Sequence, residues 1–279
     1  MVMLFSVPFL QKLASPSYDV FAYVAITAFA INMLNLAKIT SFKTLTRKQI
    51  LYTLLTIILI LLSKNNYVFI LLTLFILPMF TTPIFNFYNR SKKQSKIFFW
   101  IILAILTFFF IQFLNEKFGL INFTKIFINN YLNVVTMGRR GGNIFSVVST
   151  ILPEIFNIFW ILSAFFVMLS EERYNWKISF VLGEIMIFFI NWIGIFAGFY
   201  LVFDKPNKAF DDLSGRYLHP YIICFLPFTQ FLSYRYNLKI SKKAVQTIAV
   251  SSTLFIMVSY LIVCYYRGFI VHTTPTWVS

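Results

Sequence analysis

The chain has 279 residues, of which 59% are hydrophobic and 12% are charged, and its formal net charge is +15. In a soluble domain this basic excess would indicate a nucleic-acid partner. Here the basic residues gather in short connections between long apolar runs, a pattern that sets membrane orientation, so no nucleic-acid partner is predicted. Apolar runs that approach about 20 residues predict transmembrane helices. We therefore expect an all-α, polytopic integral membrane protein with a single transmembrane domain over residues 1–279.

The first predicted span covers residues 18–36. Ser15 and Pro16 suit the N-cap and the first position of a helix, and Asp19 follows in the first turn, where the helix dipole favours an anion. Asp19 therefore has a structural explanation. Its functional interpretation is a carboxylate at the membrane surface, on the same side as the polar loop at residues 204–220.

Two short apolar runs follow, at residues 50–62 and 67–80. At a rise of about 1.5 Å per residue, neither run comfortably crosses a hydrocarbon core about 30 Å thick. They form either two thin spans, with Lys64 between them extending to the interface, or a re-entrant hairpin. Both arrangements return the chain to the same side, and the next span is predicted at residues 97–113.

Residues 114–154 form the longest region that we expect outside the spans. Asparagine and lysine residues recur there at helical spacing opposite aromatic ones, which predicts an amphipathic helix lying in the extracytoplasmic interface; the polar positions are Asn122, Lys125, Asn129 and Asn133. Arg139 and Arg140 follow in a glycine-rich turn. They either hold a phosphate or pyrophosphate through their planar guanidinium groups, or form a flexible turn at the membrane surface.

Two further spans are predicted at residues 155–169 and 178–201. The second contains Glu184, the only acidic residue inside an apolar run, on one helical arc with small and polar residues: Gly183, Asn191, Gly194 and Gly198. Glycines four residues apart let helices approach closely, so this arc is expected to face protein. Glu184 is then either a packed, hydrogen-bonded carboxylic acid, which we favour, or part of a polar path.

The polar loop at residues 204–220 contains three of the nine acidic residues, together with Arg216 and one of the two histidines. Such a cluster beside a bilayer is either a functional site or a solvated connection. Spans at residues 218–234 and 244–266 complete about eight apolar segments. Counting the spans alternately places the four most basic connections on the cytoplasmic side, and the polar loop outside.

The sequence contains no recognisable cofactor or metal motif. Cys224 and Cys264 each lie in an apolar run without a second cysteine or histidine at metal-ligand spacing, so neither a disulfide nor a metal site is predicted. Walker, zinc-site and nucleophile-elbow patterns do not occur. We expect no cofactor.

Three short motifs occur in a characteristic order: Ser17-Tyr18-Asp19, Ser63-Lys64-Asn65-Asn66-Tyr67, and Gly215-Arg216-Tyr217-Leu218-His219-Pro220. Together they resemble the bacterial membrane family called domain of unknown function 2142. That family is similar to the GT-C class of glycosyltransferases, which take sugars from polyprenyl-phosphate carriers on the outer face of the membrane. Ser214 departs from the family, which commonly has glutamine there.

The resemblance implies a multi-pass, glycosyltransferase-like protein of the bacterial plasma membrane that acts in cell-envelope polysaccharide assembly. Its partners would be a polyprenyl-phosphate sugar and an envelope glycan acceptor. GT-C enzymes usually carry their catalytic carboxylate in a first extracytoplasmic loop, and the resemblance implies that this chain corresponds to the part of the family after that loop. The chain is therefore expected to match the C-terminal portion of such a protein, with an N-terminal half or a partner subunit supplying the rest.

The chemistry of this reaction selects the candidate residues. A carrier phosphate needs hydrogen-bond donors and cations, and an acceptor hydroxyl needs a general base. The candidate bases are Asp211, Asp212 and Asp19, and the candidate phosphate ligands are Arg216, Tyr217, Arg139, Arg140 and Lys64. The alternative is a non-enzymatic transporter of lipid-linked oligosaccharides, or a structural partner in an envelope-glycan complex.

Overall fold

The computed structural model describes residues 18–63, 65–131, 154–205, 217–238 and 240–270. These residues form helices and short connections, with no strand among them, so the all-α prediction is confirmed for the described part. Three of the described helices are long and apolar enough to cross a membrane: α6 (Lys93–Phe118), α10 (Ile178–Val202) and α12 (Lys242–Tyr265). A membrane protein is the class that these helices suggest.

The first two helices form an antiparallel pair. α2 (Tyr18–Leu36) matches the predicted span, and α3 (Arg47–Leu62) begins with a capping box. In it, the Gln49 backbone N–H donates to Thr46 Oγ1 at 3.3 Å, and the Thr46 N–H donates to Gln49 Oε1 at 2.9 Å. Asn32 Nδ2 of α2 donates to Thr53 Oγ1 of α3 at 3.0 Å, which joins the two helices.

The second of the two short apolar runs bends sharply. It begins as η2 (Asn65–Leu72), continues as α4 (Thr73–Ile76), and is followed by α5 (Pro78–Arg90) at an angle of 51°. Pro78 has no backbone N–H, and the residue before a proline is disfavoured in the helical region, so Leu77 is extended and α4 ends there. Taken together, the bent segments have the length and hydropathy of a fourth span.

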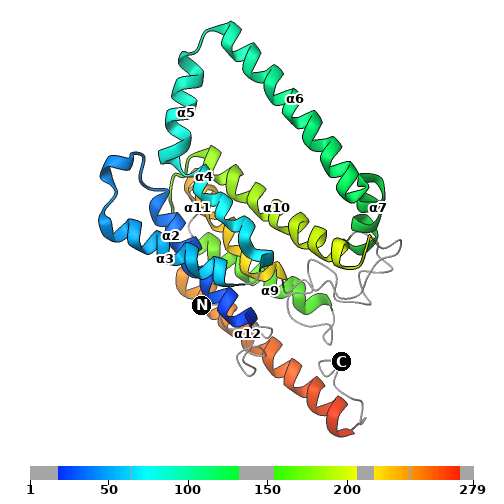
Figure 1. Ribbon diagram of the computed structural model, residues 1–279. Helices are drawn as coiled ribbons and strands as arrows, with labels where there is room; N and C mark the ends of the chain where they lie inside the picture. The colour runs from blue at the N-terminus through cyan, green and yellow to red at the C-terminus, as the bar shows by residue number, and fades with distance from the viewer. Residues whose placement is uncertain (1–17, 64, 132–153, 206–216, 239, 271–279) are drawn as a thin grey trace.

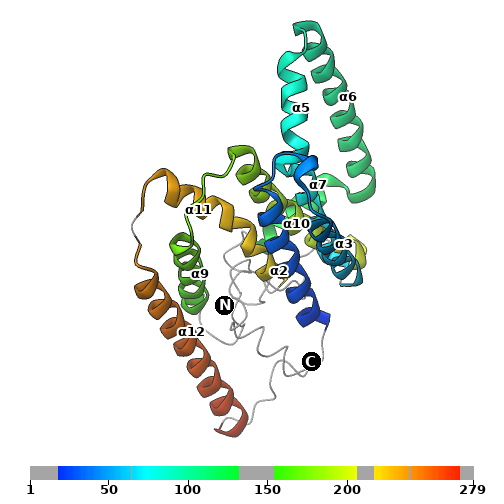
Figure 2. The ribbon, with the colours of Figure 1, turned by 90° about the vertical axis from the view of Figure 1, so that its left-hand side faces the viewer.

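The helices are arranged as a central cluster with two extensions (Figures 1 and 2). The cluster contains α2, η2, α10 and η4 (His219–Phe225), and its core includes Phe29, Phe180 and Tyr221, all fully buried. α5 and α6 stand away from it (Figure 1), and no residue of α6 is buried among the described ones. The apolar surface of α6 is therefore free to contact lipid.

The other extension consists of α9 (Glu154–Ser170) and α12, which lie side by side in Figure 2. Ser163 Oγ of α9 and Ser252 Oγ of α12 are 2.8 Å apart and share a hydrogen bond. Serine pairs of this kind link helices that pack closely in a membrane. α11 (Leu226–Arg235) follows η4 and contacts α9, which connects this extension to the cluster.

α7 (Leu120–Tyr131) corresponds to the predicted amphipathic helix, and its described part is helical as expected. Its aromatic side packs on α10: the ring centroids of Phe123 and Phe196 are 4.9 Å apart, and those of Phe127 and Trp192 are 5.2 Å apart. Asn122, predicted on the polar side, donates from Nδ2 to the Tyr200 hydroxyl at 2.8 Å. This asparagine therefore also joins α7 to α10.

The glycine arc of α10 faces protein over only part of its length. A Cβ at Gly183 would lie 2.7 Å from Ile76 of α4, and one at Gly194 would lie 2.6 Å from the Phe69 ring of η2. The prediction of close helix packing is confirmed at these two positions. Gly198 is exposed, so for this residue the prediction is wrong.

Three of the four basic connections lie against one another. The Lys38 ammonium lies 5.4 Å from the centre of the Tyr174 ring, which joins the connection after α2 to the one before α10. Arg173, in that same connection, donates to the Asn237 side chain after α11. These contacts place the three connections at one end of the helix cluster, and the side of the membrane on which they lie stays a prediction.

Our first prediction concerns this topology. Single cysteines at Lys92 and Lys242 should resist an impermeant thiol reagent in intact cells and react after permeabilisation, because basic connections are retained in the cytoplasm. A cysteine at Asp211 should react in intact cells. The unsubstituted chain, with Cys224 and Cys264, supplies the background signal. Labelling at position 92 but not at position 211 would show that the orientation is inverted.

Candidate functional site

Most of the predicted site residues lie outside the described residues. This applies to Asp211, Asp212, Arg216, Arg139, Arg140 and Lys64. Asp19 lies in the first turn of α2, as predicted, and its side chain is also outside the description. The convergence of these acidic and basic groups therefore stays a prediction.

Tyr217 is the one predicted site residue whose side chain the structure describes. It is half-buried, and its ring packs on α10 with its centroid 5.4 Å from that of Phe199. The chain then enters η4 through Leu218, which is 4% exposed. The end of the Gly-Arg-Tyr-Leu-His-Pro motif is thus held inside the helix cluster and is not a free loop.

His219 is the functional candidate that the sequence analysis missed as an individual residue. It is fully buried, and its Nδ1 lies 3.0 Å from the hydroxyl of Tyr23 on α2. The Trp160 ring of α9 packs edge-to-face against it, with the centroids 4.4 Å apart. His219 therefore joins three segments that are distant in the sequence. The available signal was its place between two apolar residues, Leu218 and Pro220, after the last charge of the loop.

Two nitrogen atoms in this contact have no hydrogen-bond partner among the described residues: His219 Nε2 and Trp160 Nε1. Both are buried, and an indole N–H only donates. Buried polar groups are nearly always hydrogen-bonded in folded proteins, so each exception needs a physical explanation.

A cavity of about 350 Å³ lies directly beside this histidine. α9 contributes Phe165 and Met168, α10 contributes Phe188 and Phe189, and η4 contributes His219. The remaining described lining residues are apolar, and none of the described ones is charged. Phe189, one of the lining residues, is 41% exposed at the surface of the helix cluster. Its size falls in the range of about 300 to 1,000 Å³ that is typical of small-molecule sites.

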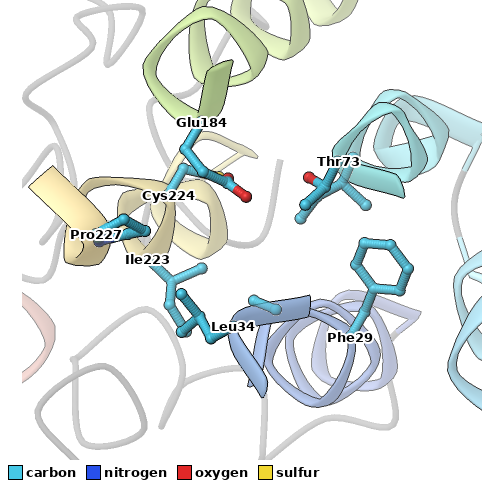
Figure 3. Close-up of a pocket in the computed structure, with 9 residues that line it drawn as sticks. Phe29, Leu34, Thr73, Glu184, Ile223, Cys224 and Pro227 are labelled. Carbon is cyan, nitrogen blue, oxygen red and sulfur yellow. The ribbon is translucent and has the colours of Figure 1, made fainter. Parts of the chain in front are cut away.

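Glu184 lines a second, much smaller cavity (Figure 3). Its carboxyl group points between α10, η4, α4 and α2, toward a space that Thr73, Cys224 and Phe29 also line. Glu184 is 5% exposed and hydrogen-bonds with the Cys224 side chain, which confirms that it is packed against protein. The cavity volume of about 10 Å³ is at the lower limit for a single water molecule.

No group of three or more histidine, cysteine or acidic side chains that could hold a metal ion occurs among the described residues. Taken together, the described residues form a helical fold with three helices long and apolar enough to cross a membrane, and an apolar cavity lies next to a buried histidine. No protein-family model, curated protein or solved structure matches the chain. The resemblance to domain of unknown function 2142 stays a prediction from three sequence motifs. Leu218 and His219, near the end of the last motif, line this cavity.

Proposed function

We propose that the chain is a glycosyltransferase-like protein of the bacterial plasma membrane that acts on a polyprenyl-phosphate-linked sugar in envelope-polysaccharide assembly. The observation that supports this most is the position of the Gly-Arg-Tyr motif. Three residues after Arg216, at His219, the chain lines an apolar cavity large enough for part of a lipid chain. A lipid-linked substrate requires an apolar space close to the groups that bind its phosphate.

In this proposal the polar loop supplies the chemistry. Arg216 and Tyr217 bind the carrier phosphate, with Arg139, Arg140 and Lys64 as further cations. Asp211, Asp212 or Asp19 accepts the proton of the acceptor hydroxyl as its oxygen forms a bond to the anomeric carbon. The bond between that carbon and the phosphate oxygen breaks, and the carrier phosphate leaves.

The finer topology belongs to the same proposal. In this topology the chain has about eight apolar segments. The polar loop lies on the extracytoplasmic side, and α7 lies in the membrane interface on that same side. Two apolar residues of α7 support the interfacial position, because Ile121 is 88% exposed and Ile128 is 45% exposed, away from the contact with α10. Exposed apolar residues on an amphipathic helix are stabilised where acyl chains can cover them.

Arg216 provides the test of this function. A guanidinium–phosphate contact is charge-assisted, and such bonds contribute about 1.5 to 3 kcal/mol. Arg216→Ala should therefore reduce glycan transfer roughly 10- to 100-fold, at about 1.4 kcal/mol per decade. Arg216→Lys should reduce it less, since lysine keeps the charge but loses the planar fork.

The measurement is the sugar composition of envelope polysaccharide in a deletion strain complemented with each variant at matched membrane level. Arg90→Ala, at the exposed end of α5, is the matched control and should complement fully. If the deletion changes no glycan, or if Arg216→Ala complements like the control, the loop is only a connection and the proposed function is wrong.

A further inference from the structure

We infer that the basic end of the helix cluster binds the headgroup of an anionic phospholipid, with the acyl chains against the exposed apolar side of α3. The basic end consists of three connections, at residues 37–48, 171–177 and 235–243. This surface uses none of the residues of the polar loop or of the cavity lining. The inference therefore does not depend on glycosyl transfer.

The first step is the position of the basic end relative to a bilayer. The contact of Lys38 with the Tyr174 ring joins the first connection to the second. Lys242 Nζ lies 3.6 Å from Glu171 Oε2, which joins the third connection to the second. α10 and α12 both begin at this end (Figure 2), and both are long and apolar enough to cross a membrane. Where such helices begin, the connections lie at the level of the lipid headgroups.

The second step is the charge of this end. The three connections contain ten of the 24 lysine and arginine residues and two of the nine acidic residues, an excess of eight positive charges. Among their described residues one ion pair occurs, between Lys242 and Glu171. Arg47 and Lys48 are exposed in the first turn of α3, which contains no acid although the helix dipole favours one there. An anionic partner would be stabilised at this surface.

The third step is the kind of anion. Leu51 follows Arg47 by four residues and Lys48 by three, so it lies on the same side of α3, and it is 69% exposed. A soluble polyanion would leave this leucine in water, whereas a phospholipid places acyl chains directly below its phosphate. Tyr234 and Tyr236 are also exposed at the basic end, and tyrosine is enriched at the headgroup level of membranes. The surface therefore fits an anionic phospholipid.

A comparison of anionic and zwitterionic lipids tests this inference. Dioleoyl phosphatidylglycerol and dioleoyl phosphatidylcholine have the same acyl chains and differ in net charge. In native mass spectrometry of the full chain in detergent, we expect tighter binding of phosphatidylglycerol. Each cation near an anionic surface contributes roughly 5-fold to binding. Arg47→Gln combined with Lys48→Gln should therefore weaken phosphatidylglycerol binding roughly 10- to 25-fold and leave phosphatidylcholine binding unchanged.

The matched control is Lys117→Gln combined with Lys125→Gln, which removes two exposed lysines from α6 and α7. It should cause a much smaller loss of phosphatidylglycerol binding, although the change in net charge is the same. The α3 substitutions should not weaken the fold, because they remove cations from the start of a helix.

Two soluble probes separate a lipid from other anions. Glycerol 1-phosphate has the phosphate without acyl chains, and a thymidine oligonucleotide is a soluble polyanion. Neither should displace phosphatidylglycerol at equal concentration. Displacement by either probe would overturn the inference, as would equal binding of the two lipids or an equal loss in the two double variants. None of these results depends on the glycan assay of Arg216.

Discussion

Glu184→Lys should nearly abolish folded protein in the membrane. Glu184 is 5% exposed, and the neighbouring cavity of about 10 Å³ has room for no more than one water molecule. A lysine ammonium there would replace a group that hydrogen-bonds with Cys224, and the described residues around the cavity include no other acid. An unpaired buried charge costs at least about 3 kcal/mol, a large share of the stability of a typical domain.

Glu184→Gln is the matched control, since it keeps the shape and hydrogen-bonding capacity without a charge. We expect it to insert and accumulate like the unsubstituted chain, measured by quantitative immunoblotting of membranes and by the size-exclusion profile in detergent. Severe loss of Glu184→Gln would indicate that a charged partner is required. Normal accumulation of Glu184→Lys would show that this side chain reaches water.

The burial of Glu184 could be predicted from the sequence because helical periodicity determines which residues share a face. Gly183, Asn191 and Gly194 lie on the arc of Glu184, and the structure places them against protein. Periodicity does not determine how far a partner extends along the helix. Gly198 lies on the same arc, but this glycine is exposed. The length of a helix contact depends on tertiary structure.

The central role of His219 could be predicted only in part. Its place between Leu218 and Pro220 indicated burial, but the charged composition of the preceding loop suggested a solvated position. The partner that buries it, Tyr23, is 196 residues away in the chain. The two prolines of the following segment were the more informative local signal. Pro220 and Pro227 lie at the starts of η4 and α11, where a missing N–H costs nothing, so the predicted span is two helical pieces.

The predicted site and the described cavity consist of different residues, because a sequence reveals charged loops more readily than it reveals apolar packing. Charged residues in loops attract notice in an apolar sequence, and six of the eight predicted site residues lie outside the described part of the chain. The described lining of the cavity is instead mostly phenylalanine and isoleucine side chains, which are abundant throughout the sequence. Such residues give no local signal, because each has the same character as a residue facing lipid. Only the packing of α9 against α11 and of η4 against α10 distinguishes them.

Phe196→Ala should produce the other large loss of stability, by opening the aromatic contact between α7 and α10. Phe196 is fully buried, and its ring centroid lies 4.9 Å from that of Phe123 and 5.1 Å from that of Phe127. Removing a buried phenylalanine ring costs about 3 to 5 kcal/mol, through lost contacts and the cavity that remains. Phe110→Ala on α6 is the matched control. Phe110 is 59% exposed, so its ring stabilises little inside the protein and the change should have a small effect.

The measurement is the midpoint temperature of unfolding in detergent. The signal is the loss of the monodisperse size-exclusion peak after heating. We expect Phe196→Ala to lower it by several degrees and Phe110→Ala to leave it nearly unchanged. Asn122→Ala should cause a smaller loss than Phe196→Ala, since it removes one hydrogen bond to Tyr200 and leaves the rings packed. If Phe196→Ala and Phe110→Ala shift the midpoint equally, α7 does not rest on α10 through these rings, and the helix is held by the membrane surface alone.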